Sequence, residues 1–272
     1  MTRKISTGVG SLAVRVRGQG PPAVLWHSLF VDERSWGRVE EEWSTERRVV
    51  SITGPGHGAS EDPGRRYTTT ECAAAAGTVL DELGVDEPVD WVGNAWGGHV
   101  GIVFATDAPS RCRTLVTLGT PVQALNRAER ARTVFLLSAH RMLGPVGFIR
   151  SGVTNVLLSA TTRERDPEAV ALVEDCLVRA DRAALRNAVV SISLHRPDLT
   201  GRLPGLPVPT LFVTGSDHKG WTLEQARAAS RLVPHASCAV VDGAAYLVPL
   251  EAPAETTDLV RRFWAASVPG YT

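Results

Sequence analysis

The most restrictive feature of the sequence is a glycine-framed turn at residues 93–97. Residues 89–100 read VDWVGNAWGGHV: an apolar run typical of a buried strand, the segment GNAWG, and the start of a helix. This spacing is that of the G-x-S-x-G nucleophile elbow, a strained strand-to-helix turn that lifts its central side chain clear of a sheet. Catalytic versions have Ser, Cys or Asp at the centre, whereas this chain has Ala95. A methyl group cannot attack a substrate, so the turn indicates a fold without indicating a reaction.

Short apolar runs alternate with helical stretches on both sides of this turn. Such alternation is typical of a largely parallel sheet covered by helices. The alternating run Ser11–Arg17 predicts an edge strand, and Thr69–Leu83 predicts an alanine-rich helix. The other predicted strands are Pro22–His27, Arg48–Thr53, Val89–Val92, Arg113–Leu118, Thr210–Thr214 and Ser237–Val241, with further helices at Gly98–Thr106 and Ala254–Ala266.

The alternation stops after Leu118. Between Pro121 and Arg202 the sequence predicts no strand, only helix-period segments at Arg127–Met142, Pro167–Ala180 and Arg182–Leu194. A block of helices between two strands of one sheet is typical of an inserted cap. We therefore predict an α/β core made of residues 1–120 and 203–272, with a helical cap, or lid, at residues 121–202.

The composition argues against several classes of protein. The 29 basic and 29 acidic residues give a formal net charge of zero, which argues against nucleic acid or an anionic membrane as the main partner. No apolar run suits a signal peptide or a membrane helix, and the four cysteines lack metal-binding spacing. The sequence thus predicts a cytoplasmic protein without metal or organic cofactor. Whether it forms a homodimer stays open.

Four segments, in the right order, resemble the α/β-hydrolase superfamily. WHSLF at residues 26–30 is similar to the family's H-G-x-x turn, and the resemblance assigns one oxyanion-hole amide to Leu29, beside Ser28. GPGHGAS at residues 54–60 is similar to the PGHGxS loop, the elbow follows, and LEAP at residues 250–253 is similar to an E-x-P segment. The resemblance covers nearly the whole chain except the cap. It implies an α/β-hydrolase fold, a mostly parallel twisted sheet flanked by helices, with an inserted helical cap.

All three positions of the family's catalytic triad depart from its pattern. The nucleophile position holds Ala95, the expected acid position after the sixth strand of the core holds His218, and the expected histidine position holds Tyr246. Triad catalysis needs a hydroxyl, a base that takes its proton and an acid that orients the base. The resemblance therefore implies that acyl-serine chemistry does not run on this sequence.

The backbone donors of an elbow survive these replacements. The amide of Trp96 begins a helix, and together with the Leu29 amide it would hold a carbonyl or alkoxide oxygen. Tyr246 is a candidate proton donor, because an ordinary tyrosine pKa of about 10 makes it a poor base. The alternative is that Tyr246 only fills the volume of the histidine. The Trp96 side chain is expected to form an apolar wall.

The remaining candidates lie near the acid position, on turns that match the family pattern, or on the helix after the elbow. His218 is either a displaced base or an exposed loop residue, and we favour the exposed loop. Asp217, one residue earlier, either orients Tyr246 or His218 or forms an ordinary turn after a strand. Structural roles are expected for the other histidines of the core turns, which are His27, His57 and His99.

The sequence favours an enzyme that forms no covalent link with a small apolar substrate. Cyclisation, elimination, isomerisation and epoxide opening all benefit from a held oxygen and a donated proton. Polyketide-like secondary metabolites are the first substrate class to test. The near absence of lysine among the basic residues is typical of a GC-rich bacterial genome and does not bear on the mechanism. Two alternatives remain: an esterase or epoxide-type hydrolase whose nucleophile is replaced by Ala95, and a non-catalytic ligand-binding protein.

Overall fold

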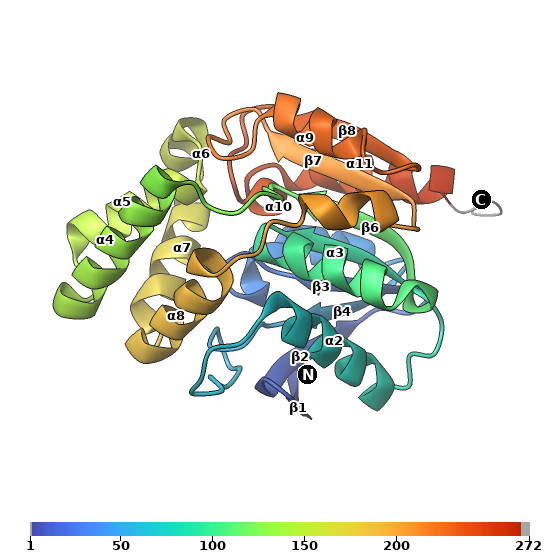
Figure 1. Ribbon diagram of the computed structural model, residues 1–272, viewed down its shortest axis with the longest axis horizontal. Helices are drawn as coiled ribbons and strands as arrows, with labels where there is room; N and C mark the ends of the chain where they lie inside the picture. The colour runs from blue at the N-terminus through green and yellow to red at the C-terminus, as the bar shows by residue number, and fades with distance from the viewer. Residues whose placement is uncertain (1, 268–272) are drawn as a thin grey trace.

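An eight-stranded sheet forms the centre of the molecule (Figure 1). The computed structural model describes residues 2–267, and its strands follow the order β1-β2-β4-β3-β5-β6-β7-β8. Strand β2 is antiparallel to both neighbours, and every other pair is parallel, which confirms the predicted fold class. The strands are Thr2–Thr7 (β1), Gly10–Arg17 (β2), Pro22–Trp26 (β3), Arg48–Ile52 (β4), Val89–Asn94 (β5), Cys112–Leu118 (β6), Thr210–Gly215 (β7) and Ala236–Val241 (β8).

One predicted position in the sheet is wrong. The strand predicted at Ser11–Arg17 is not an edge strand, because β2 lies between β1 and β4. The edge is β1, whose side chains are mostly polar and exposed and therefore give no apolar pattern. Only Ile5 of β1 is buried, opposite Leu12 of β2, and this pair anchors the edge to the core.

Helices cover both faces of the sheet. The central strands are buried on both sides, so in β3 Val24 and Trp26 face one core whereas Ala23 and Leu25 face the other. The first core is covered by α2 (Thr69–Glu82), α3 (Trp96–Asp107) and α9 (Leu223–Ser230). The second core is covered by α1 (Gly37–Trp43) and α11 (Pro253–Ser267), with the short helix α10 (Val248–Glu251) beside them.

A group of helices connects β6 to β7 and lies to one side of the sheet (Figure 1). They are α4 (Arg127–Leu143), α5 (Gly147–Leu157), α6 (Ala160–Arg165), α7 (Pro167–Arg179) and α8 (Arg182–Ala188), followed by a π-helical stretch at Val189–Leu194. We call residues 126–195 the helical segment. It packs around a third apolar cluster, which it shares with Val31, Leu247 and Leu250 of the core. Within residues 2–267 no helix has the length and apolarity needed to cross a membrane.

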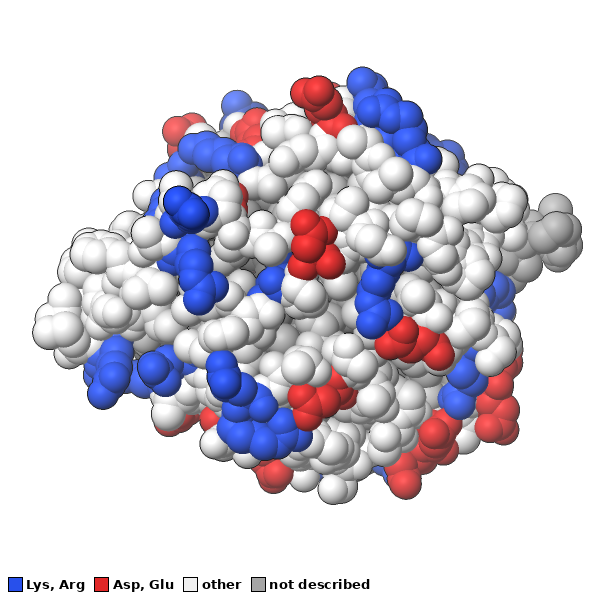
Figure 2. Space-filling model, viewed as in Figure 1, with Lys and Arg blue, Asp and Glu red and all other residues white. Residues whose placement is uncertain are grey.

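Charges of both signs are interspersed over most of the face in Figure 2, but one ion-pair network is buried. Asp90 of β5 is fully buried and accepts hydrogen bonds from Arg47, from Arg113 and from the Thr114 hydroxyl. The Arg47 guanidinium also lies 4.2 Å from the ring centre of Trp264. Both carboxylate oxygens therefore accept hydrogen bonds, and the network lies at the end of β5 opposite the elbow.

Replacing Asp90 tests how strongly this network stabilises the sheet. Asp90→Asn should lower the free energy of unfolding by about 3 kcal/mol, because it removes the negative charge from a fully buried ion-pair network. Urea unfolding at neutral pH measures the loss. Asp81→Asn is the control, since the Asp81–Arg111 pair is exposed and should contribute at most about 1 kcal/mol. Equal losses in the two variants would contradict the prediction.

Candidate active site

The turn between β5 and α3 has the strained backbone of an elbow although its central side chain is a methyl. Ala95 has φ 47° and ψ −101°, a conformation that residues other than glycine rarely adopt. Its amide donates to Leu118 O at 2.8 Å, and its carbonyl accepts from Gly98 N and His99 N. The turn is therefore tied to β6 on one side and to the first turn of α3 on the other.

Close packing explains the glycines on either side of Ala95. A Cβ at Gly93 would lie 2.1 Å from the Gly97 carbonyl carbon, and a Cβ at Gly97 would lie 1.8 Å from Trp26 O. Both distances are far below van der Waals contact, so only glycine lets α3 begin this close to β5 and β3. The steric requirement is independent of the nucleophile, which is why the turn persists without one.

The second half of the expected oxyanion hole is the loop after β3. Phe30, next to Leu29, has φ 69°, and it and Ala95 are the only non-glycine residues with positive φ in the described chain. His27 fixes this loop: its Nδ1 donates to Ser28 O at 2.7 Å, and its Nε2 accepts from Gly54 N at 2.8 Å. Strained backbone of this kind concentrates at functional sites.

The amide of Trp96 is the first of α3, so it has no partner inside the helix. The indole ring lies elsewhere. It packs against Trp26, His27 and His57, with 1% of the residue exposed, and covers Gly54, where a Cβ would meet the ring at 2.2 Å. The main contacts of the indole ring are therefore with core residues and not with the pocket. The residue borders the cavity, but its ring fills the core.

A cavity of about 450 Å³ lies over these amides, between the carboxyl ends of the strands and the helical segment. Ser28, Leu29, Ala95 and Trp96 border it from the core side. Most of the side chains that α4, α5 and the later helices contribute are apolar, among them Leu136, Leu137, Ile149, Val153, Leu157, Leu177, Leu185, Val189 and Ile192. Such a lining suits a small, largely apolar molecule.

Tyr246 borders the cavity from the loop after β8, and its position is fixed from three sides. Asn94 Nδ2 donates to its carbonyl oxygen at 2.8 Å. Glu251 Oε1 accepts from the amides of Ala245 and Leu247, the two residues that flank the tyrosine. A Cβ at Gly220 would lie 2.5 Å from the Tyr246 hydroxyl oxygen, so glycine makes room for that hydroxyl. Burial raises the pKa of Tyr246 above its usual 10, so the hydroxyl keeps its proton at neutral pH.

His218 is buried, so the favoured interpretation as an exposed loop residue is wrong. The residue is 3% exposed, and its ring packs against Tyr246 with ring centres 3.7 Å apart and a tilt of 32° between the ring planes. Its Nδ1 accepts from Gly220 N at 3.1 Å, and burial lowers its pKa to about 4. His218 therefore stays neutral and lies behind the tyrosine.

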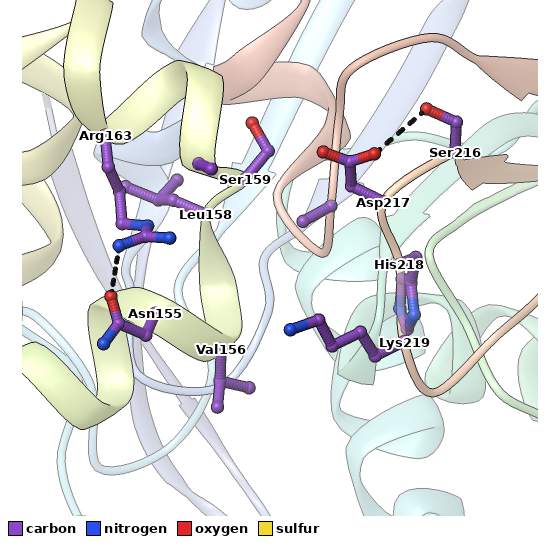
Figure 3. Close-up of a pocket in the computed structure, with 11 residues that line it drawn as sticks. Asn155, Val156, Leu158, Ser159, Arg163, Ser216, Asp217, His218 and Lys219 are labelled. Carbon is purple, nitrogen blue, oxygen red and sulfur yellow. Dashed lines mark hydrogen bonds between the residues drawn. The ribbon is translucent and has the colours of Figure 1, made fainter.

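Asp217 lies in a separate outer cleft of about 440 Å³, shown in Figure 3, and not in the cavity. Its side chain is exposed and its nearest polar partner is the Ser216 hydroxyl, at 3.5 Å. The structure thus gives Asp217 no contact that would orient Tyr246 or His218. Asn155, Val156 and Lys219 border both the cleft and the cavity, so the cleft adjoins the cavity.

Comparison with known proteins identifies the family. A family model described as the alpha/beta hydrolase family matches residues 23–259. The chain belongs to the alpha/beta hydrolase family. Its fold is shared with a thermophilic esterase from Thermogutta terrifontis (TM-score 0.90, 25% identity, covering 98% of this chain and 99% of that one). It is also shared with an enol-lactonase from Burkholderia xenovorans LB400 (TM-score 0.88, 22% identity, covering 96% and 99%).

Several relatives are named as hydrolases. A 2-hydroxy-6-oxo-2,4-heptadienoate hydrolase of Pseudomonas putida is 35% identical over 113 residues, which are 41% of this chain and 38% of that protein. A 2-hydroxy-6-oxononadienedioate/2-hydroxy-6-oxononatrienedioate hydrolase of Cupriavidus pinatubonensis is 27% identical over 232 residues, 78% of this chain and 73% of that protein. The first match thus spans about two fifths of the relative's length.

The sequence analysis assigned no role to two residues near the site, Arg196 and Glu251. Arg196 borders the cavity, its Nε is buried without a hydrogen-bond partner, and it forms no ion pair with a carboxylate of the described residues. Burial lowers the pKa of Arg196. Glu251, part of the LEAP segment, fixes the loop of Tyr246 to the helical segment by accepting from Ser159 N and the Thr162 hydroxyl. The sequence signal for Glu251 was the E-x-P segment, whereas nothing in the sequence marks Arg196.

No metal site is evident in residues 2–267, where no three His, Cys, Asp or Glu side chains gather closely enough to hold an ion. His99 borders the cavity as a neutral group: its Nε2 donates to Pro121 O at 2.7 Å, and burial lowers its pKa to about 3. With so low a pKa it is a very weak base. His99 is therefore poorly suited to removing a proton from a bound substrate.

The strain at Ala95 is measurable. Ala95→Gly should leave the free energy of unfolding unchanged or raise it by up to about 1 kcal/mol, because relief of the positive φ offsets the entropy of glycine. Ala244→Gly makes the same chemical change at a buried residue without positive φ and should lower stability by about 1 kcal/mol or more. Chemical denaturation of both variants checks this. Similar losses in both would show that the turn at Ala95 is unstrained.

Burial of His218 predicts a dependence of stability on pH. Its folded-state pKa of about 4 lies below the unfolded value of 6.5, so its contribution is complete above pH 6.5 and is lost as the pH falls towards 4. Between about pH 7 and about pH 5 the native protein should lose about 2 kcal/mol more than His218→Asn, which keeps an acceptor for Gly220 N. His235→Asn, at an exposed histidine, should behave like the native protein. Parallel pH profiles for all three would refute the prediction.

Proposed function

We propose that the protein is an enzyme that forms no covalent link with its substrate and acts on a small, largely apolar molecule through a carbonyl or related oxygen. The Leu29 and Trp96 amides hold this oxygen, and Tyr246 donates a hydrogen bond or a proton to it. In enzymes that depend on such donors, each contributes about 3 kcal/mol to transition-state stabilisation. Cyclisation or isomerisation within one bound molecule fits best, because the substrate then supplies its own nucleophile; elimination and epoxide opening use the same donors.

The observation that carries this proposal is the exchange of a base for a protonated donor. In a triad the histidine accepts a proton from the nucleophile. The resemblance assigns the corresponding position to Tyr246, whose hydroxyl stays protonated. Ala95, at the nucleophile position, has no proton to give, and both residues border the cavity. The groups that remain all donate, so they favour the development of negative charge on a bound oxygen.

The charges around the cavity support a substrate with an anionic group or an enolate. Arg132, Arg196 and Lys219 border the cavity, and none forms an ion pair with a described carboxylate. The one acid at the cavity, Glu129, already accepts from Asn126 N as the cap of α4. Two of the relatives are named as hydrolases of oxo-acids, compounds that carry a carbonyl and a carboxylate. We propose polyketide-like molecules, which combine several carbonyls with an acidic group, as the first substrates to test.

Binding of substituted phenols tests the proposed donors, because a phenolate presents an oxygen anion on an apolar ring. The native protein should bind the ionised form, and Tyr246→Phe should weaken binding by about tenfold or more, through loss of a hydrogen bond to a charged group. Isothermal titration measures the affinities. The control is Tyr67→Phe, which removes a buried tyrosine hydroxyl bonded to Pro55 O outside the cavity. Unchanged affinity in Tyr246→Phe would mean that Tyr246 only fills space.

Ala95→Ser distinguishes this proposal from a hydrolase that has merely lost its nucleophile. The Ala95→Ser variant should not hydrolyse 4-nitrophenyl esters, because the protonated Tyr246 cannot accept the proton of the introduced hydroxyl. A burst of nitrophenolate followed by turnover would instead support the hydrolase. Tight phenolate binding without conversion of any carbonyl substrate would support a ligand-binding protein.

A further inference from the structure

One corner of the molecule exposes a cluster of large apolar side chains. Of eight such exposed side chains in the described residues, six lie between positions 134 and 148, where α4 turns into α5. We call them the apolar corner: Val134, Phe135, Met142, Leu143, Val146 and Phe148. Phe135 is 67% exposed, Met142 80% and Phe148 58%. A contiguous exposed cluster of this kind marks an interaction site more often than a solvated surface.

The apolar corner lies in a stretch of the chain that is basic although the whole chain is neutral. From Arg130 to Arg163 the sequence contains five arginines and no acidic residue. Arg127, Arg130 and Arg141 are exposed. They stand seven and four residues before Val134 and seven residues after it on α4, so they share its outward face. None of the three forms an ion pair with a carboxylate of residues 2–267. The surface around the apolar corner is therefore positively charged, although the net charge of the whole chain is zero.

The outward face of α4 is not needed to build the cavity. The opposite face, at Glu129, Arg132, Thr133, Leu136, Leu137 and His140, borders the cavity. The helix therefore has one face for the site and another that is apolar and basic. Helices with large apolar residues and arginines on one exposed surface lie on membrane interfaces, with the apolar side chains among the acyl chains and the arginines at the phosphates.

We propose that the apolar corner binds an anionic lipid surface. Helices α4 and α5 form one end of the molecule in Figure 1, and this end is largely white in Figure 2 with blue side chains beside it. A second copy of the chain is disfavoured, because a twofold interface would place the arginines of one subunit against those of the other. An acidic protein matches the charge, but a protruding apolar corner fits the deformable surface of a lipid layer better than a second rigid surface.

Lipid binding would place one wall of the cavity next to the membrane. Because α4 separates the apolar corner from the cavity, a substrate dissolved in lipid would have a short path to the site. This consequence rests on the proposed apolar substrate, whereas lipid binding itself does not.

Sedimentation of the full-length protein with vesicles tests the proposal. Vesicles of phosphatidylcholine mixed with phosphatidylglycerol should bind the protein about tenfold or more tightly than phosphatidylcholine alone, and added salt should weaken binding. Phe135→Ser combined with Phe148→Ser should reduce binding about tenfold or more, and Arg127→Gln combined with Arg141→Gln should reduce it by a similar factor.

The matched control combines Val178→Ser and Leu232→Ser, the two exposed apolar side chains outside the corner, and it should bind like the native protein. Circular dichroism confirms that each variant is folded. Equal binding of both vesicle types, or native-like binding of the Phe135→Ser and Phe148→Ser protein, would overturn the proposal. Absence of vesicle binding would also overturn it. If the native protein is then a dimer that the Phe135→Ser and Phe148→Ser protein does not form, the corner is assigned to a second copy. If the native protein is then a monomer, an acidic protein is the favoured partner.

Discussion

The close approach of α3 to β3 and β5 is the constraint on which the site depends. Gly93 and Gly97 allow that approach, and no larger residue fits at either position. Ala95 then takes a backbone conformation that costs about 1–3 kcal/mol in general. Because the packing of the helix sets this conformation, loss of the nucleophile changes neither the turn nor the direction of the Trp96 amide. The strained turn therefore still presents the Trp96 amide as a hydrogen-bond donor, although residue 95 carries no nucleophile.

His218 and Tyr246, which the resemblance assigns to the other two triad positions, lie in contact with each other. In a triad, an imidazole must approach the nucleophile and must change its charge during catalysis. Here the imidazole of His218 stacks behind Tyr246, and burial lowers its pKa to about 4. Both rings are neutral at physiological pH, and the only proton that they offer to the cavity is that of the tyrosine hydroxyl. A site of this kind suits the proposed chemistry, in which an oxygen is polarised and no proton is cycled through a base.

Sequence reasoning found the fold because its signals are local. The glycine spacing at residues 93–97, the apolar strands and the capped helices each depend on neighbours in the chain. It failed for His218, because the burial of that residue comes from Tyr246, 28 residues further along the chain. It missed β1 because only Ile5 of that strand is buried. The role of Arg196 could not be predicted either, because this residue reaches the cavity only through the tertiary packing of the helices.

The two faces of α4 connect the site to the surface. A helix whose inner face borders a cavity normally presents a polar outer face, because that face is exposed to water. Val134, Phe135 and Met142 depart from that rule, although they are not needed for the third apolar cluster. Folding alone gives no reason to keep such side chains in water, at a cost of about 1.5–3 kcal/mol each relative to burial. A surface that buries them on contact removes this cost, and the arginines beside them restrict that surface to one with negative charge.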